Sequence, residues 1–117
     1  MSLVTVNAKR LGLGSFNVKT TNKNVRYALK TQLELAKINR AIEASANSDT
    51  DDMDTVIKTL EAQEKLVEVE IDFLTGISPK SVTREKIEDA DFDAMNDIVL
   101  NAIGHILGYD QNKSRKH

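Results

Sequence analysis

The chain has 117 residues, 40% of them apolar, and contains no cysteine and no tryptophan. Its length predicts one small domain with a modest core, and the lack of cysteine excludes disulfides and thiolate zinc sites. The net charge of -2 conceals a segregation: the balance is +6 over residues 1–46, -11 over residues 47–112 and +3 over the last five residues.

Residues 1–22 allow two interpretations. Residues 3–6 (LVTV) and 16–20 (FNVKT) are typical of strands, and the glycine-containing segment 9–14 (KRLGLG) separates them. They form either a β-hairpin or an extended arm that orders against a neighbouring subunit. An isolated two-stranded hairpin is only marginally stable in water, so the sequence leaves both interpretations open.

The first helix is expected from residue 25 to about residue 46, with Asn22 or Asn24 as its N-cap. Two adjacent rows of apolar residues predict its packed face. They are Ala28, Leu35, Ile38 and Ile42, and beside them Leu29, Leu33 and Ala36. The opposite face, with Lys30 and Lys37, is expected in solvent. Residues 47–51 (NSDTD) are expected to form a loop.

The central helix is expected over residues 52–77, ended by Gly76 as a left-handed cap and by Pro79. Its main apolar row is Met53, Val56, Ile57, Leu60, Val67, Ile71 and Leu74; its flanking row is Leu66, Val69, Phe73 and Ile77. We expect the main row, including Leu60 and Ile71, in the core of the subunit. Because the apolar band is wider than one packed neighbour needs, we expect the flanking row to face a partner or another subunit.

Thr83 is expected to cap a short helical piece, and Asp89 or Asp91 a last helix that ends near Leu107 with Gly108 as its cap. Residues 109–117 are expected to be a flexible tail. The prediction is a mainly α fold: a single helical domain (1–117) of three main helices, up-down-up, with a short β-like or extended N-terminal segment. Alternatively, the last helix packs onto a neighbouring chain.

No catalytic constellation is visible, so we expect no enzyme, no cofactor and no metal. Asp93, Asp97, Asn101 and His105 share a helix face at spacings of four, but one histidine among carboxylates makes a weak metal site. The row is better explained as the solvated side of an amphipathic helix. No apolar run approaches the roughly 20 residues that span a bilayer, so no membrane partner is expected.

The basic first section raises the question of nucleic acid. Only Phe16 and Tyr27 are available there to stack on bases, and the whole chain is acidic, so nucleic acid is not expected. We expect instead that the basic section of one subunit meets the acidic section of another. Lys30 and Lys37 are the candidate contacts, with Glu68 or Asp72 as their counterparts.

Three segments in this order resemble the small tail assembly chaperones of long-tailed (siphovirus-type) bacteriophages, particularly those of Gram-positive bacteria. They are LKTQLELAKINRAI (29–42), MDTVIKTLEAQEKLVEVEIDFLTGI (53–77) and REKIEDADFDAMNDIVLNAIGHILG (84–108). The resemblance implies a host-cytoplasmic protein that binds the tape-measure protein, keeps it soluble during tail tube assembly and self-associates. The alternatives are a nucleic-acid-binding or regulatory helical module and a structural head or neck component.

Overall fold

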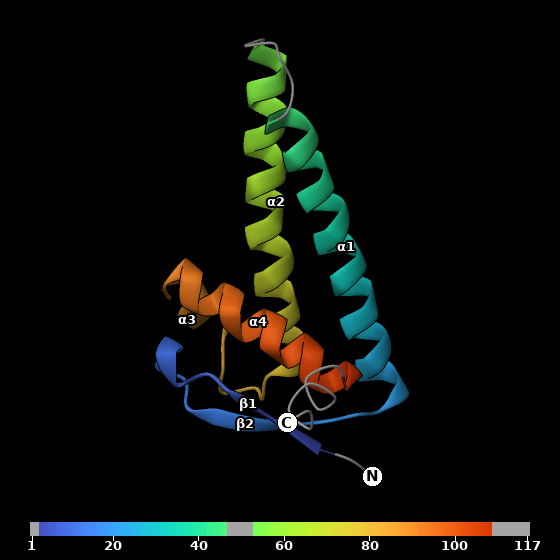
Figure 1. Cartoon of the computed structure of the whole chain (residues 1–117). Coiled ribbons are helices and arrows are strands. Elements are labelled where there is room, and N and C mark those ends of the chain that lie inside the picture. The colour runs from blue at the N-terminus through green and yellow to red at the C-terminus, as the bar shows by residue number, and fades with distance from the viewer. Residues whose placement is uncertain (1–2, 47–52, 109–117) are drawn as a thin grey trace, which may run out of the picture.

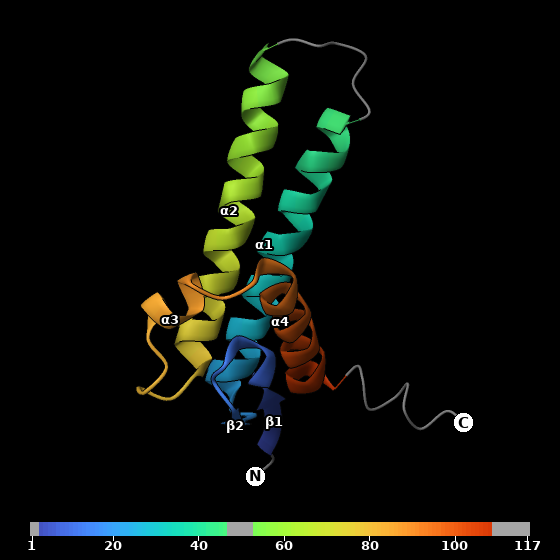
Figure 2. The same ribbon diagram turned by 90° about the vertical axis from the view of Figure 1, so that its left-hand side faces the viewer.

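The computed structural model describes residues 3–46 and 53–108, in which two long helices rise from a compact base (Figures 1 and 2). The long helices are α1 (Asn22–Ala46) and α2 (Met53–Ile77), which pack antiparallel as a helical hairpin. The base consists of β1 (Leu3–Asn7), the 3₁₀ turn η1 (Lys9–Leu11), β2 (Ser15–Lys19), α3 (Arg84–Glu88) and α4 (Phe92–Leu107). The mainly α fold is confirmed. The expected loop at 47–51 and tail at 109–117 lie outside the described residues.

Strands β1 and β2 pair antiparallel, so the N-terminal segment is a hairpin rather than an extended arm. Val4 lies opposite Val18, and Val6 opposite Phe16. Val6 and Val18 are both buried in the core, and β1 lies against α4. Helix α4 therefore covers the apolar face of the hairpin. An isolated hairpin, whose apolar face is exposed to water, would be only marginally stable. Gly12 closes the η1 turn in the left-handed conformation, with φ 77°.

The helix ends follow local capping chemistry, with one correction. Helix α1 begins at residue 22, and its N-terminus is capped by Thr21, whose hydroxyl accepts a hydrogen bond from the Asn24 backbone at 3.2 Å. The expectation of an asparagine cap was wrong, because the Asn24 amide donates backwards to the Lys19 carbonyl at 2.8 Å. The expected caps at Thr83, Asp91 and Gly108 are confirmed.

Helix α4 crosses the base instead of running alongside the whole helical hairpin, so the third leg of the up-down-up arrangement was wrong (Figure 1). It packs within the subunit against α1, α2 and β1. At 1.5 Å per residue, its 16 residues extend about 24 Å, against about 38 Å for the 25 residues of α2. A helix of that length covers only part of the hairpin.

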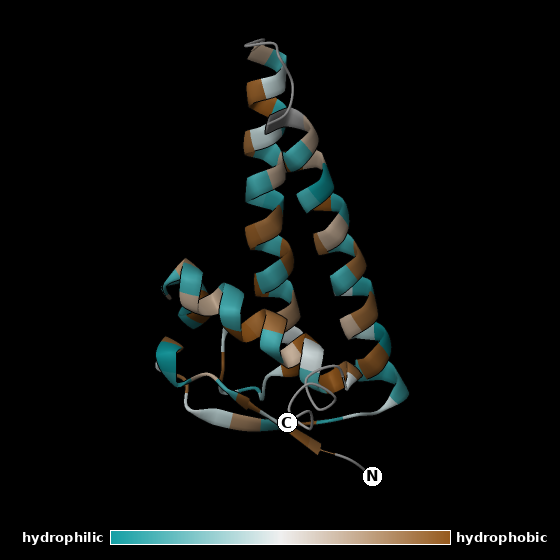
Figure 3. Ribbon diagram, viewed as in Figure 1, coloured by the Kyte–Doolittle hydropathy of each residue, from teal (hydrophilic) through white to brown (hydrophobic). Residues whose placement is uncertain are grey.

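The main apolar row of α2 is therefore divided. Its C-terminal half is buried, with Ile71 and Leu74 at 3% and 2% exposure. Apolar residues continue along the part of α2 above α4 (Figure 3). In that N-terminal half of the row, Leu60 is 58% exposed. The expectation that Leu60 is buried was wrong, because no other element in residues 3–46 and 53–108 covers that half of the row.

The flanking row of α2 also lies differently from the prediction. Phe73 and Ile77 are buried in the core of their own subunit, which corrects the expectation that they face a partner. Leu66 and Val69 are half-buried and pack against the same core. The cause is helix α1: its Tyr27 ring lies 5.5 Å from the Phe73 ring, measured between centroids.

Candidate protein-docking surfaces

The largest exposed apolar side chains of α2 form one strip on its N-terminal half. This α2 strip consists of Met53, Val56, Ile57 and Leu60, each between 45% and 67% exposed. Spacings of three and four place the four side chains on one helix face. Exposed Asp54, Glu61 and Glu64 lie among and beyond them along the helix. A contiguous apolar surface with a charged border is typical of a protein-interaction site.

Helix α1 has a smaller pair of exposed apolar residues, and the charged residues around this pair are basic rather than acidic. Leu29 and Leu33 are about half exposed and lie one helical turn apart. Their exposed neighbours along the helix are Arg26, Lys30 and Lys37. The buried row of α1, which includes Ala28, Leu35 and Ile38, faces the core. The second expected row of α1 is therefore solvent-facing.

Two adjoining cavities of about 460 and 470 Å³ open between α1 and α2 near the base. Tyr27, Lys30 and Gly76 line both of them. The first is completed by Lys23, Asn24 and Arg26, and the second by Thr31, Glu34, Val69, Asp72, Phe73, Thr75 and Arg84. Lys30 thus lies at a groove, whereas Lys37 is exposed on α1 outside it. The expected contact residues Lys30, Lys37, Leu66, Val69, Phe73 and Ile77 do not form one surface.

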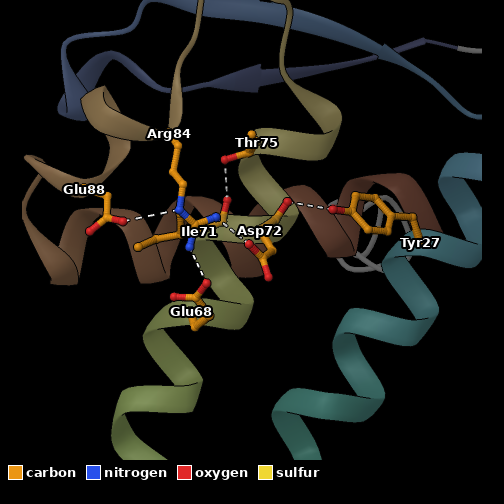
Figure 4. A network of polar contacts seen from close by, with 7 residues as sticks. All are labelled: Tyr27, Glu68, Ile71, Asp72, Thr75, Arg84 and Glu88. Carbon is orange, nitrogen blue, oxygen red and sulfur yellow. Dashed lines mark hydrogen bonds and ion pairs between the residues drawn. The ribbon is translucent and has the colours of Figure 1, made fainter.

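Tyr27 joins the two helices at the floor of this groove (Figure 4). Its hydroxyl donates a hydrogen bond to the Asp72 carbonyl oxygen at 2.6 Å, and burial is the main cause that raises its pKa. A Cβ on Gly76 would lie 2.2 Å from the tyrosine hydroxyl oxygen. Gly76 lies inside α2, which continues to Ile77, so the expectation that it caps the helix was wrong. Its function is to admit the ring.

Replacing Gly76 with alanine should destabilise the protein, although alanine is the better helix former. The helix-propensity gain is about 1 kcal/mol, whereas forcing a side chain into packed space typically costs about 1–3 kcal/mol. Thermal unfolding followed by circular dichroism measures the net effect. In a Tyr27→Ala background, the same change should become stabilising because the obstructing ring is gone. A Gly76→Ala protein more stable than the wild type would contradict the close approach.

Arg84 connects α3 to α2 through three carboxylates (Figure 4). It donates to Asp72 at 2.6 Å and to Glu68, and it pairs with Glu88 at 3.3 Å. The Asp72 hydrogen bond is the largest cause that raises the Arg84 pKa. Glu68 and Asp72 thus have a cationic partner within the subunit, and both stay more than half exposed. The expectation that they meet Lys30 and Lys37 of another subunit stays a prediction.

Glu70 is a buried carboxyl that sequence reasoning missed. It is 0% exposed, neither carboxylate oxygen has a hydrogen-bond partner among residues 3–46 and 53–108, and burial raises its pKa to about 7. A signal was present: Glu70 is three or four residues from Leu66, Val67, Phe73 and Leu74, and so lies between the two apolar rows of α2. When both apolar rows of a helix pack into the core, a polar residue that lies between them is buried as well.

The possible metal row on α4 is part of the polar surface. Asp97 pairs with Arg10 of η1 at 2.9 Å, with both side chains more than half exposed. Among residues 3–46 and 53–108, no three His, Cys, Asp or Glu side chains are grouped so that they can hold a metal ion. In the same ranges, no helix has the length and apolar character needed to cross a membrane.

Exposed apolar strips and open grooves on a helical hairpin are typical of helical proteins that bind other proteins. The chain belongs to the phage tail assembly chaperone (TAC) proteins, whose family model matches residues 4–117. No match was found among curated proteins or among solved structures. The resemblance to tail assembly chaperones is thereby confirmed, and the family implies a non-enzymatic role with protein partners in tail assembly.

Proposed function

We propose that this chaperone binds the tape-measure protein and keeps it soluble in the host cytoplasm while the tail tube assembles around it. We propose further that it acts as a single domain, and that its phage is a long-tailed one of a Gram-positive host, as the sequence resemblance implies. The family supports the general role. The observation that carries the proposal is the α2 strip, an apolar helix face left uncovered in the subunit.

The shape of this surface favours a helical client segment. Amphipathic helices dock through apolar residues spaced by three and four, and the α2 strip has the same spacing. Asp54, Glu61 and Glu64 are exposed on the same half of α2. A client helix with basic residues beside its apolar face would therefore be complementary in charge. The chaperone would act by covering the apolar face of a client helix until the client is assembled.

Changing Ile57 and Leu60 together to serine should abolish client capture without unfolding the chaperone. Both side chains are exposed, so the double variant loses docking surface and little core. The measurement is the soluble fraction of the tape-measure protein on co-expression with each chaperone, together with the helix content of the purified chaperone.

The matched control changes two other exposed leucines, Leu3 and Leu100, to serine. That protein should keep the tape-measure protein soluble, as the wild type does. Equal solubility of the client with the Ile57/Leu60 variant and with the wild type would refute the assignment of the α2 strip.

We also propose that the chaperone self-associates. The supporting observation is that exposed charges on α1 are mainly basic and those on α2 mainly acidic, so two copies can bring unlike helices together. Exposed charges are screened over about 8 Å at physiological ionic strength and over about 3 Å at 1 M salt. Raising the salt concentration should therefore loosen the assembly while the subunit stays folded.

A further inference from the structure

We propose that the basic groove at the N-terminal half of α1 is the docking site for the α2 strip of a second copy. The α1 groove is the first cavity described above, lined by Lys23, Asn24, Arg26, Tyr27, Lys30 and Gly76. The inference rests on the proposed self-association and gives it two specific, different surfaces. Because the α2 strip is also the proposed client site, self-association and client capture compete for it.

Charge complementarity is the first argument. Lys23, Arg26 and Lys30 line the groove, and within residues 3–46 and 53–108 none of them forms an ion pair. No Asp or Glu precedes Glu34 in the chain, so this end of α1 is purely basic. Residues 53–65 of α2 have Asp54, Glu61 and Glu64 against Lys58 and Lys65, a balance of -1, whereas the groove has three cations. The two surfaces therefore attract each other.

Apolar area is the second argument. Exposed Leu29 and Leu33 follow the groove along α1, and the half-buried Tyr27 ring contributes to its floor. The α2 strip offers Met53, Ile57 and Leu60 on the same half of the helix as its acidic residues. Exposed ion pairs contribute only about 0–1 kcal/mol each, so the apolar contact supplies most of the affinity and the charges fix the register.

The positions of the surfaces determine the kind of assembly. The groove lies near the base and includes Gly76, whereas the strip begins at Met53, at the other end of the same 25-residue helix (Figures 1 and 2). The strip lies about 25 Å or more from the groove along the axis of α2, so it cannot enter the groove of its own subunit. The contact between copies is therefore heterologous, and such contacts close into rings or continue as open chains.

Two charge-reversal variants test this pairing. The groove variant is Lys23→Glu, Arg26→Glu and Lys30→Glu; the strip variant is Asp54→Lys, Glu61→Lys and Glu64→Lys. Each alone should lose self-association by roughly tenfold or more in dissociation constant, from three lost pairs and added repulsion. Combining all six changes in one chain should restore association, because the signs are exchanged on both sides.

Mixing the two variants gives the sharpest result. In the mixture, the normal groove of one variant meets the normal strip of the other, and the reversed groove meets the reversed strip, so both contacts are again complementary in charge. Light scattering should show assemblies larger than the 13.0 kDa subunit in the mixture, although each variant alone stays dissociated. A mixture that stays monomeric would overturn the proposal, as would a groove variant that assembles like the wild type.

Controls separate this inference from the proposed function. Lys9→Glu, Lys80→Glu and Lys86→Glu together change the net charge equally at exposed sites away from the groove, and this protein should assemble normally. The groove variant retains the α2 strip and should still keep the tape-measure protein soluble. Wild-type protein that is monomeric at every salt and protein concentration would refute self-association, and this docking site with it, but not client capture. If the triple groove variant loses helix content, Arg26→Glu alone should still weaken assembly about two- to fivefold.

Discussion

Replacing Leu74 with alanine should lower the free energy of unfolding by about 2–5 kcal/mol. Leu74 is 2% exposed and belongs to the core between the helical hairpin and the base. Truncating it removes apolar contacts and leaves a cavity that close-packed neighbours fill only in part. Chemical denaturation followed by circular dichroism gives the difference directly.

Leu60 is the matched control, since it has the same residue type, helix and apolar row but is 58% exposed. Its replacement by alanine should change the unfolding free energy by no more than about 0.5 kcal/mol. The comparison belongs at high salt and low protein concentration, where the proposed contact between copies is weakened. Equal destabilisation by the two substitutions would show that the upper half of α2 is covered within the subunit.

Replacing Glu70 with glutamine should remove a pH dependence of stability that the wild type shows between about pH 4.5 and 7. Burial raises the pKa of the folded carboxyl to about 7, whereas its ordinary value is 4.5. Below pH 4.5 the group is protonated in both the folded and the unfolded chain. Between the two values, the unfolded chain releases its proton and the folded chain keeps it.

Since the unfolded chain then binds fewer protons, the free energy of unfolding falls as the pH rises through this window. A pKa difference of one unit corresponds to about 1.4 kcal/mol, so the loss approaches about 3 kcal/mol by pH 7 and stays constant above it. The measurable quantity is the difference in unfolding free energy between the wild type and the Glu70→Gln variant across a pH series.

Glu64→Gln serves as the control for removing one carboxylate, because Glu64 is exposed on the same helix. Glu70→Gln should change the pH dependence of stability more than Glu64→Gln does. Glu70→Leu should be more stable than the wild type at pH 8, where the buried carboxylate is ionised and unpartnered. A Glu70→Gln difference that does not change between pH 4.5 and 7 would contradict burial of this carboxyl.

Local chemistry accounts for the elements that the sequence predicted. Thr83, Asp91 and Gly108 were recognisable as helix boundaries because a cap depends on residues within one turn of it. The helix periods and the mainly α class follow from the spacing of apolar residues in the same way. Even the asparagine error at α1 is a local one, because Thr21, which caps the helix, is the residue next to the expected Asn22.

The candidate surfaces were predicted less well, because exposure depends on what lies across from a residue. The spacing of Leu60 and Leu74 is equivalent in the sequence, yet only the second is buried. Conversely, Phe73 was expected to face a partner because the apolar band is wider than one packed neighbour needs, but α1 buries Phe73 within the subunit. The spacing of apolar residues predicts how wide an apolar band is. It does not predict how far along the helix another element covers that band.

The sequence was enough to predict the helices, most of their ends, the separation of basic and acidic sections and the resemblance to tail assembly chaperones. The hairpin of residues 3–19, the enclosure of Glu70 and the space that Gly76 leaves for Tyr27 are visible only in the folded chain. For the division of the α2 apolar row, the physical reason is the placement of α4. This helix crosses only the base, so it completes the core around the C-terminal half of α2 and leaves the N-terminal half uncovered.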